Sequence, residues 1–180
     1  MSRLTLITGS QACGKTSYVH KLLSEAAQHD YVGVICPAVF KNNNKIGIDA
    51  LLLTGSLDTA ERIRLATLSA QVEYPIPEDT GYLWDFDQTS LDKVNEHLRS
   101  LAANQTSTKT QPSQTLVIDE LGSMEFIHNQ GFTAAFGLLD KPAYEHSIVV
   151  VRLSCIEYAS ARWQDTYDPF EILNLSESEL

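Results

Sequence analysis

The feature that most constrains the fold of this 180-residue chain is the run of residues 9–16, which reads G-S-Q-A-C-G-K-T. The apolar residues 4–8 precede it as a buried strand would, and residues 19–26 carry apolar side chains at helical spacing. Two glycines between a strand and a helix let the backbone curl until successive N–H groups point at one anion. The pattern G-x-x-x-x-G-K-T in this context predicts a phosphate-binding loop.

The residue types in the loop fit the phosphates of a nucleotide and its metal ion. Lys15 can reach the β- and γ-phosphate oxygens, and the Thr16 hydroxyl can ligate the Mg²⁺ that accompanies them. The start of the helix adds partial positive charge. The alternative is a glycine-rich turn that merely joins a strand to a helix. The predicted phosphate-binding residues are Gly9, Ser10, Gln11, Ala12, Cys13, Gly14, Lys15, Thr16 and Ser17.

A second motif, L-V-I-D-E at residues 116–120, supplies the acidic partner that a phosphate loop needs. The apolar residues 116–118 predict a buried strand, and acidic residues follow at its carboxyl end, where open α/β sheets bind ligands. We expect Asp119 to hold Mg²⁺ with Thr16, and Glu120 to orient or deprotonate the attacking water. Alternatively, the two acids only end a strand.

Two further residues are candidates for the catalytic site. Glu125 follows Gly122, which permits a turn that returns the glutamate to the site as a second candidate base. Arg152 ends an apolar run and could steady charge on the phosphates. The plainer interpretations are an exposed loop acid for Glu125 and, for Arg152, an ion pair with an acid such as Glu157.

The rest of the chain alternates apolar runs with amphipathic helical patterns, which predicts one α/β domain over residues 1–180 with a mainly parallel sheet and helices on both faces. Residues 58–61 have the form of a capping box and predict a short helix through Leu68. Residues 102–114 are polar and poorly patterned, so we expect a mobile surface loop, and residues 176–180 a frayed tail. Further strands are expected at 31–37, 46–53, 82–87, 115–119, 147–153 and 170–175, and helices around 91–101, 132–139 and 156–163.

The run V-I-D-E-L-G-S-M-E-F at residues 117–126 resembles V-I-D-E-I-G-x-M-E-L of a small family of P-loop nucleoside triphosphatases, the cancer-related type. The resemblance implies a RecA-like domain that hydrolyses nucleoside triphosphates to diphosphates with Mg²⁺ and loose base selectivity. Ser123 stands where the family commonly has lysine, and the basic Asn-Arg near the family's C-terminus is not evident here. These departures suggest a divergent branch.

Net charge, the lengths of apolar runs and the cysteine pattern exclude several kinds of function. The formal net charge is −10 with only 13 basic residues, which argues against a nucleic-acid clamp and against binding to anionic lipid. No run of 18 apolar residues and no signal peptide are found, and the three cysteines lack metal-ligand spacing. These features predict a cytoplasmic protein with reduced thiols.

We therefore expect a Mg²⁺-dependent nucleoside triphosphatase acting on ATP or GTP. A small-molecule or nucleotide kinase on the same fold is the enzymatic alternative, although residues 39–87 offer only four cations for a lid: Lys41, Lys45, Arg62 and Arg64. A nucleotide-binding switch without enzymatic function is the other alternative. Aromatic residues such as Trp84 could stack on a base or belong to the core. The preferred base, the oligomeric state and any protein partner are not readable from the sequence.

Overall fold

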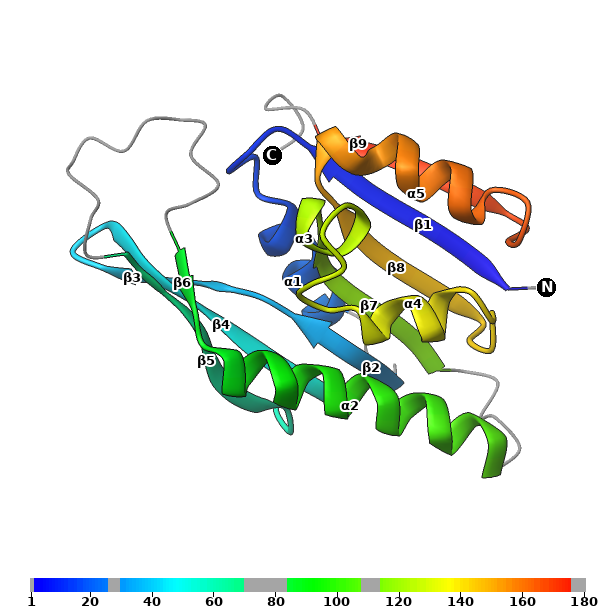
Figure 1. Ribbon diagram of the computed structural model, residues 1–180, viewed down its shortest axis with the longest axis horizontal. Coiled ribbons are helices and arrows are strands. Elements are labelled where there is room, and N and C mark those ends of the chain that lie inside the picture. The colour runs from blue at the N-terminus through cyan, green and yellow to red at the C-terminus, as the bar shows by residue number, and fades with distance from the viewer. Residues whose placement is uncertain (1, 26–29, 70–83, 108–113, 176–180) are drawn as a thin grey trace.

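Nine strands form one mixed sheet in the part of the chain that the computed structural model describes, which is residues 2–25, 30–69, 84–107 and 114–175 (Figure 1). The strand order is β6-β5-β4-β2-β7-β8-β1-β9, and β3 pairs with β4. The neighbours β2, β7, β8, β1 and β9 are parallel, whereas β3, β4, β5 and β6 extend the sheet by antiparallel pairing. The strands are β1 (Arg3–Gly9), β2 (Asp30–Ile35), β3 (Ala38–Lys41), β4 (Asn44–Gly55), β5 (Glu61–Leu68), β6 (Trp84–Phe86), β7 (Gln114–Leu121), β8 (His146–Val151) and β9 (Phe170–Leu175).

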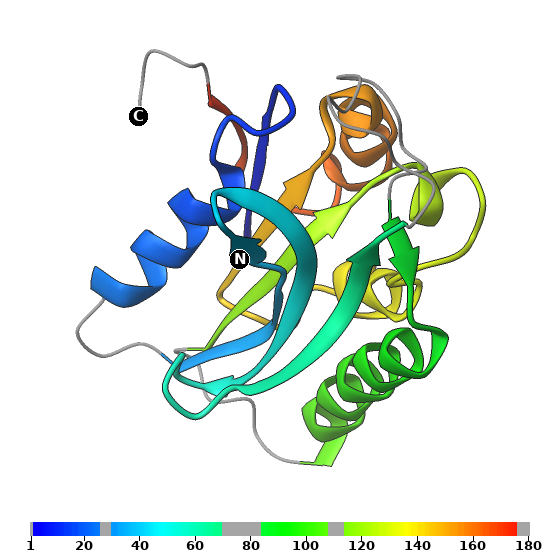
Figure 2. The same ribbon diagram turned by 90° about the vertical axis from the view of Figure 1, so that its left-hand side faces the viewer.

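Helices cover the two faces of the sheet unequally. Of the described helices, α1 (Lys15–Glu25) lies on one face, and the other face holds α2 (Gln88–Ser107), α3 (Ser123–Phe126), α4 (Ala134–Leu139) and α5 (Ile156–Trp163) (Figures 1 and 2). Each face has its own core. Leu6 and Ile118 pack toward Trp163 and the helices of the larger layer, while Ile7 and Val117 pack with Val19 of α1. Successive side chains of a buried strand point to opposite faces of the sheet, so each strand contributes to both cores. The predicted α/β fold is confirmed.

The predicted helix over residues 58–68 is wrong, because residues 61–68 form strand β5. Arg62 and Arg64 alternate with Ile63 and Leu65, which is the period of a strand. β5 pairs with β4, and both arginines donate to Asp49 across that pair, Arg62 Nη1 at 3.1 Å from Oδ2. Asp58 and Thr59 of the expected capping box lie in a turn and Glu61 begins β5, since pairing along the whole strand outweighs a local capping preference.

Parts of residues 102–114, where a loop is expected, are helix and strand. Helix α2 continues through Ser107, and β7 already begins at Gln114, so only residues 108–113 of that range lie outside the described part. Polar composition indicated a loop, but it does not by itself end a helix that lacks glycine or proline. The tail at 176–180 and residues 82–83 of the predicted strand also lie outside the described residues. Among the described helices, none is long and apolar enough to cross a membrane.

Candidate functional site

The loop between β1 and α1 encloses the ammonium group of Lys15. Its Nζ donates to the carbonyl oxygens of Ser10 at 2.9 Å and Gly9 at 3.3 Å, and the side chain is only 8% exposed. Gly9 has φ +154°, and a Cβ there would collide with the Leu175 carbonyl oxygen and with the Cys13 sulfur. Only glycine therefore lets the chain leave β1 and curl back over Lys15. The predicted phosphate loop thus has the expected strand, turn and helix around it.

The start of α1 meets the end of β7 through one hydrogen bond. Thr16 Oγ1 donates to Asp119 Oδ1 at 3.3 Å, although the two residues are 103 positions apart, and the backbone N–H of Cys36 donates to Oδ2 at 3.0 Å. Burial, and after it the negative charge of Glu120, raise the pKa of Asp119 to about 7, against the lowering effect of its hydrogen bonds with Cys36 and Thr16. A cation bound beside this carboxylate would stabilise its charged form, which burial and the neighbouring acid disfavour.

The donor set fits a magnesium ion in chemical terms. A threonine hydroxyl and a carboxylate are hard oxygen ligands, and Mg²⁺ is usually bound through one or two protein oxygens together with the phosphates of the substrate. Thr16 and Asp119 are therefore the residues that could hold the metal.

Glu120 is held by an arginine from the neighbouring strand. Arg152 follows β8 directly, and its Nε donates to Glu120 Oε1 at 2.6 Å. Its backbone N–H donates to Leu121 O at 3.0 Å, and its side chain passes so close to Gly122 that a Cβ there would lie 2.9 Å from Arg152 Cδ. The side chains of Glu120 and Arg152 are 27% and 52% exposed, so both can meet a ligand. The ion-pair partner of Arg152 is thus Glu120 rather than Glu157.

The carboxylate of Glu125 is occupied by backbone groups. Its Oε2 accepts from the N–H of Gly122 at 2.8 Å, and its Oε1 accepts from the N–H of Phe132 at 2.9 Å. The residue is 7% exposed, and burial raises its pKa against the lowering effect of these hydrogen bonds. Glu125 therefore ties the start of α3 to the segment that leads into α4.

Lys45, one of the four cations considered for a lid, lies near the tip of the β3–β4 hairpin, opposite Phe40. Its Nζ lies 4.8 Å from the centroid of the Trp84 ring. Burial lowers its pKa and the charge of Arg152 lowers it too, whereas Glu120 and Asp119 raise it. Two acids of the second motif thus act on its ammonium group. Its place follows from strand pairing between distant segments, which no local pattern reveals.

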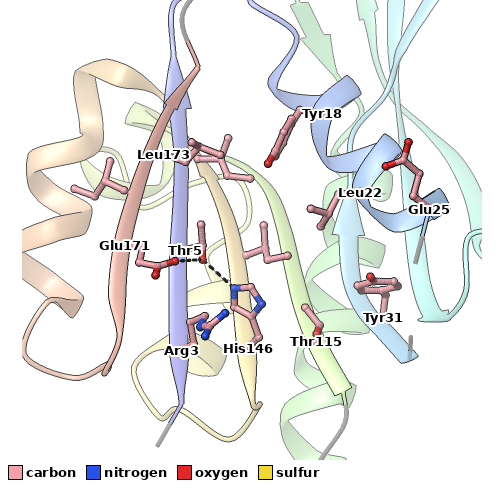
Figure 3. A pocket seen from close by; sticks show the side chains of 13 residues that line it. Arg3, Thr5, Tyr18, Leu22, Glu25, Tyr31, Thr115, His146, Glu171 and Leu173 are labelled. Carbon is pink, nitrogen blue, oxygen red and sulfur yellow. Dashed lines mark hydrogen bonds between the residues drawn. The ribbon is translucent and has the colours of Figure 1, made fainter. Parts of the chain in front are cut away.

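A separate groove of about 820 Å³ lies on the face that α1 covers (Figure 3). Ile7, Ile148 and Leu173 line its apolar part, and Thr5 Oγ1 and His146 Nε2 form a 2.9 Å hydrogen bond at its polar end. None of the site residues predicted from the sequence lines this groove.

Comparisons with known proteins show the family and the fold. A family model described as NTPase matches residues 4–152. The solution structure of a human cancer-related nucleoside triphosphatase is similar, with a TM-score of 0.63 and 23% identity over 97% of this chain and 89% of that one. THEP1 from the hyperthermophile Aquifex aeolicus has a TM-score of 0.61 and 12% identity over 96% of this chain and 90% of its own. No curated protein sequence matches the chain significantly.

Proposed function

The chain belongs to the NTPase family, and from this premise we propose that it hydrolyses nucleoside triphosphates, ATP and GTP among them, to the diphosphate and inorganic phosphate. The proposal includes a requirement for Mg²⁺ and broad selectivity for the base. The loop amides and Lys15 bind phosphates, which all nucleoside triphosphates share. Because these contacts are the same whatever the base, they support broad base selectivity.

Each residue of the site has a role in this reaction. Lys15 binds the β- and γ-phosphates, and Thr16 and Asp119 hold Mg²⁺, which when bound neutralises charge on the phosphate oxygens. A water oxygen attacks the γ-phosphorus while the bond to the bridging oxygen breaks and its electron pair leaves with the diphosphate. Glu120 accepts the proton of that water, for which its carboxylate offers Oε2 while Arg152 binds Oε1.

The observation that carries the proposal is the hydrogen bond between Thr16 and Asp119. It joins the phosphate loop to the acidic motif, and Glu120 is the next residue in the chain. Arg152 shares its positive charge with Glu120 and, in this proposal, with the phosphates as charge moves toward the leaving group.

One contact favours hydrolysis over phosphoryl transfer to a small molecule. A kinase needs cations that close over two phosphorylated ligands. Arg62 and Arg64, two of the four cations considered for such a lid, both bind Asp49 within the sheet. That pairing supports water as the acceptor.

Glu120→Gln tests the proposed function. The variant keeps the shape of the side chain but cannot accept the proton, so we expect nucleotide affinity to be retained and turnover to fall by about 10²- to 10⁴-fold. Affinity is measured by calorimetry and turnover by phosphate release, with Glu157→Gln, an exposed acid on α5, as the matched control. Unchanged turnover in Glu120→Gln would remove Glu120 from the mechanism. Tight binding with no hydrolysis by the unmodified protein would favour a kinase or a binding switch.

A further inference from the structure

Gly122 follows strand β7 directly, and the side chain of Arg152 lies against it. A Cβ at this position would be 2.9 Å from Arg152 Cδ, 3.2 Å from Nε and 3.3 Å from Cγ. Non-bonded carbon atoms attract most strongly at about 3.5 to 4.0 Å, so a methyl group does not fit beside this side chain. Because the three atoms are consecutive in arginine, the middle of the Arg152 side chain crosses the backbone at Gly122.

The backbone conformation of Gly122 is not what requires glycine. Its φ of −147° and ψ of −153° are extended, and residues with a side chain adopt a negative φ readily. Gly9 and Gly33, in contrast, have a positive φ that favours glycine. What glycine supplies at position 122 is therefore space, and Arg152 occupies that space.

Hydrogen bonds hold the backbone around Gly122 in place. Its N–H donates to Glu125 Oε2 at 2.8 Å, and its carbonyl oxygen accepts from the N–H of Phe126 at 3.0 Å. The carbonyl oxygen of Leu121, the preceding residue, accepts from the N–H of Arg152 at 3.0 Å. Because these contacts fix the backbone on both sides, an added methyl group would displace the half-exposed side chain of Arg152 instead.

The part of Arg152 that crosses Gly122 is also the part that binds Glu120. The donor to Glu120 Oε1 is Nε, at 2.6 Å, and Nε is one of the three atoms that a Cβ at position 122 would approach. A hydrogen bond weakens steeply when its donor is misaligned. A side chain at position 122 would therefore separate Arg152 from Glu120 and leave the carboxylate free to rotate.

We propose that Gly122 is a positioning residue: its missing side chain provides the space across which Arg152 reaches Glu120, and so fixes the orientation of the carboxylate that accepts the proton of the attacking water. The inference rests on the proposed function, because it takes the roles of Glu120 and Arg152 from there. It adds to the acidic motif a position that acts through the residue after β8.

Gly122→Ala tests the placement of Arg152 by nuclear magnetic resonance on the ¹⁵N-labelled protein without nucleotide. The readout is the Nε–H signal of Arg152, assigned by its loss in Arg152→Lys. Bound to a carboxylate, this N–H should exchange slowly with water. In Gly122→Ala the signal should shift toward its position in Glu120→Ala and exchange at least about tenfold faster. Gly137→Ala is the matched control, since a Cβ there meets no described atom within 4 Å, and should leave the signal unchanged.

Phosphate release in a double-mutant cycle tests the effect on the reaction. Gly122→Ala should lower kcat by about 10- to 100-fold and change KM by less than about twofold, because the displaced contact acts in the transition state. In an Arg152→Ala background the methyl group meets no arginine side chain. Adding Gly122→Ala there should change kcat by less than about twofold.

An unchanged Arg152 signal in Gly122→Ala would overturn the inference. So would an equal loss of kcat in both backgrounds, because the methyl group would then act through the fold. If Gly122→Ala fails to fold, rescue of folding by Arg152→Ala would place the clash at Arg152, and failure of that rescue would overturn the inference. The signal is measured without nucleotide, so it tests the placement separately: absence of phosphate release by the unmodified protein would contradict the proposed function alone.

Discussion

Asp119 is the residue at which the fold and the proposed chemistry meet. It is fully buried, yet it accepts hydrogen bonds from Thr16 and from the backbone of Cys36. Those hydrogen bonds orient both oxygens but do not offset the cost of burying the charge beside Glu120, which is why its pKa rises to about 7. A residue placed in this way stabilises a bound cation better than it stabilises the metal-free protein.

The first residue-scale prediction concerns the stability of the metal-free protein. In EDTA the folded state keeps the proton on Asp119 up to about pH 7, whereas an unfolded chain loses it near pH 4. The contribution of this group to the free energy of unfolding is therefore fully present below pH 4 and is lost as pH rises to about 7, by up to about 4 kcal/mol. Urea unfolding at several pH values should show this loss relative to Asp119→Asn. Parallel pH profiles for the two proteins would contradict it.

The second residue-scale prediction separates Glu125 from Glu120. In Glu125→Gln an NH₂ group replaces one of the oxygens that accept from Gly122 and Phe132, so one buried N–H loses its partner. The free energy of unfolding should fall by about 1 to 3 kcal/mol, with turnover per folded molecule retained. Denaturant unfolding and phosphate release on the same preparation measure both. A variant with unchanged stability and no turnover would move the role of base to Glu125.

At the scale of elements, strand order decides which residues meet. The phosphate loop follows β1 and the acidic motif ends β7, and β8 lies between these two strands in the sheet. Arg152, the first residue after β8, is therefore placed between the two motifs, next to Glu120. The pairing of β8 with β7 is interrupted between Ile118 and Leu121, at the acidic residues themselves.

The element-scale prediction concerns Gly33, where β2 pairs with β7. Gly33 has φ +118°, and a Cβ there would clash with the carbonyl oxygen of Val117 on β7. Gly33→Ala should lower the free energy of unfolding by more than about 2 kcal/mol, because strand β7 would have to move. Gly137→Ala is the matched control: nothing lies near its Cβ position in α4, so the variant should gain about 0.5 to 1 kcal/mol. Thermal and urea unfolding measure both, and equal stability of the two variants would refute this account of β2.

Elements with strong local patterns could be predicted from the sequence, and those set by distant pairing could not. The strands around the two motifs and helix α2 follow from apolar runs and helical spacing, and the family resemblance at residues 117–126 is confirmed. For β5 the local signals conflict: residues 58–61 have the form of a capping box, whereas residues 62–65 alternate as in a strand. Pairing with β4, where Arg62 and Arg64 bind Asp49, decides for the strand. The contact of Lys45 with Trp84 could not be predicted either, since pairing of the hairpin strands brings these distant residues together.

At the scale of the whole molecule, an otherwise acidic chain places basic side chains at its two motifs. The formal net charge is −10, yet Lys15 lies in the phosphate loop and Arg152 pairs with Glu120 of the acidic motif. A cationic phosphate loop on an acidic protein attracts a polyphosphate, while the remaining acidic surface repels longer polyanions. This arrangement suits a small anionic substrate.

The central claim is that the phosphate loop and the acidic motif together hydrolyse nucleoside triphosphates. The most direct measurement is phosphate release from ATP, GTP, CTP and UTP, in Mg²⁺ and in EDTA, for the unmodified protein and for Lys15→Ala. Lys21→Ala, an exposed lysine of the same helix, is the control. We predict release from all four nucleotides in Mg²⁺ alone, lost in Lys15→Ala and kept in Lys21→Ala. Release that persists in EDTA or in Lys15→Ala, or no release from any nucleotide, would contradict the claim.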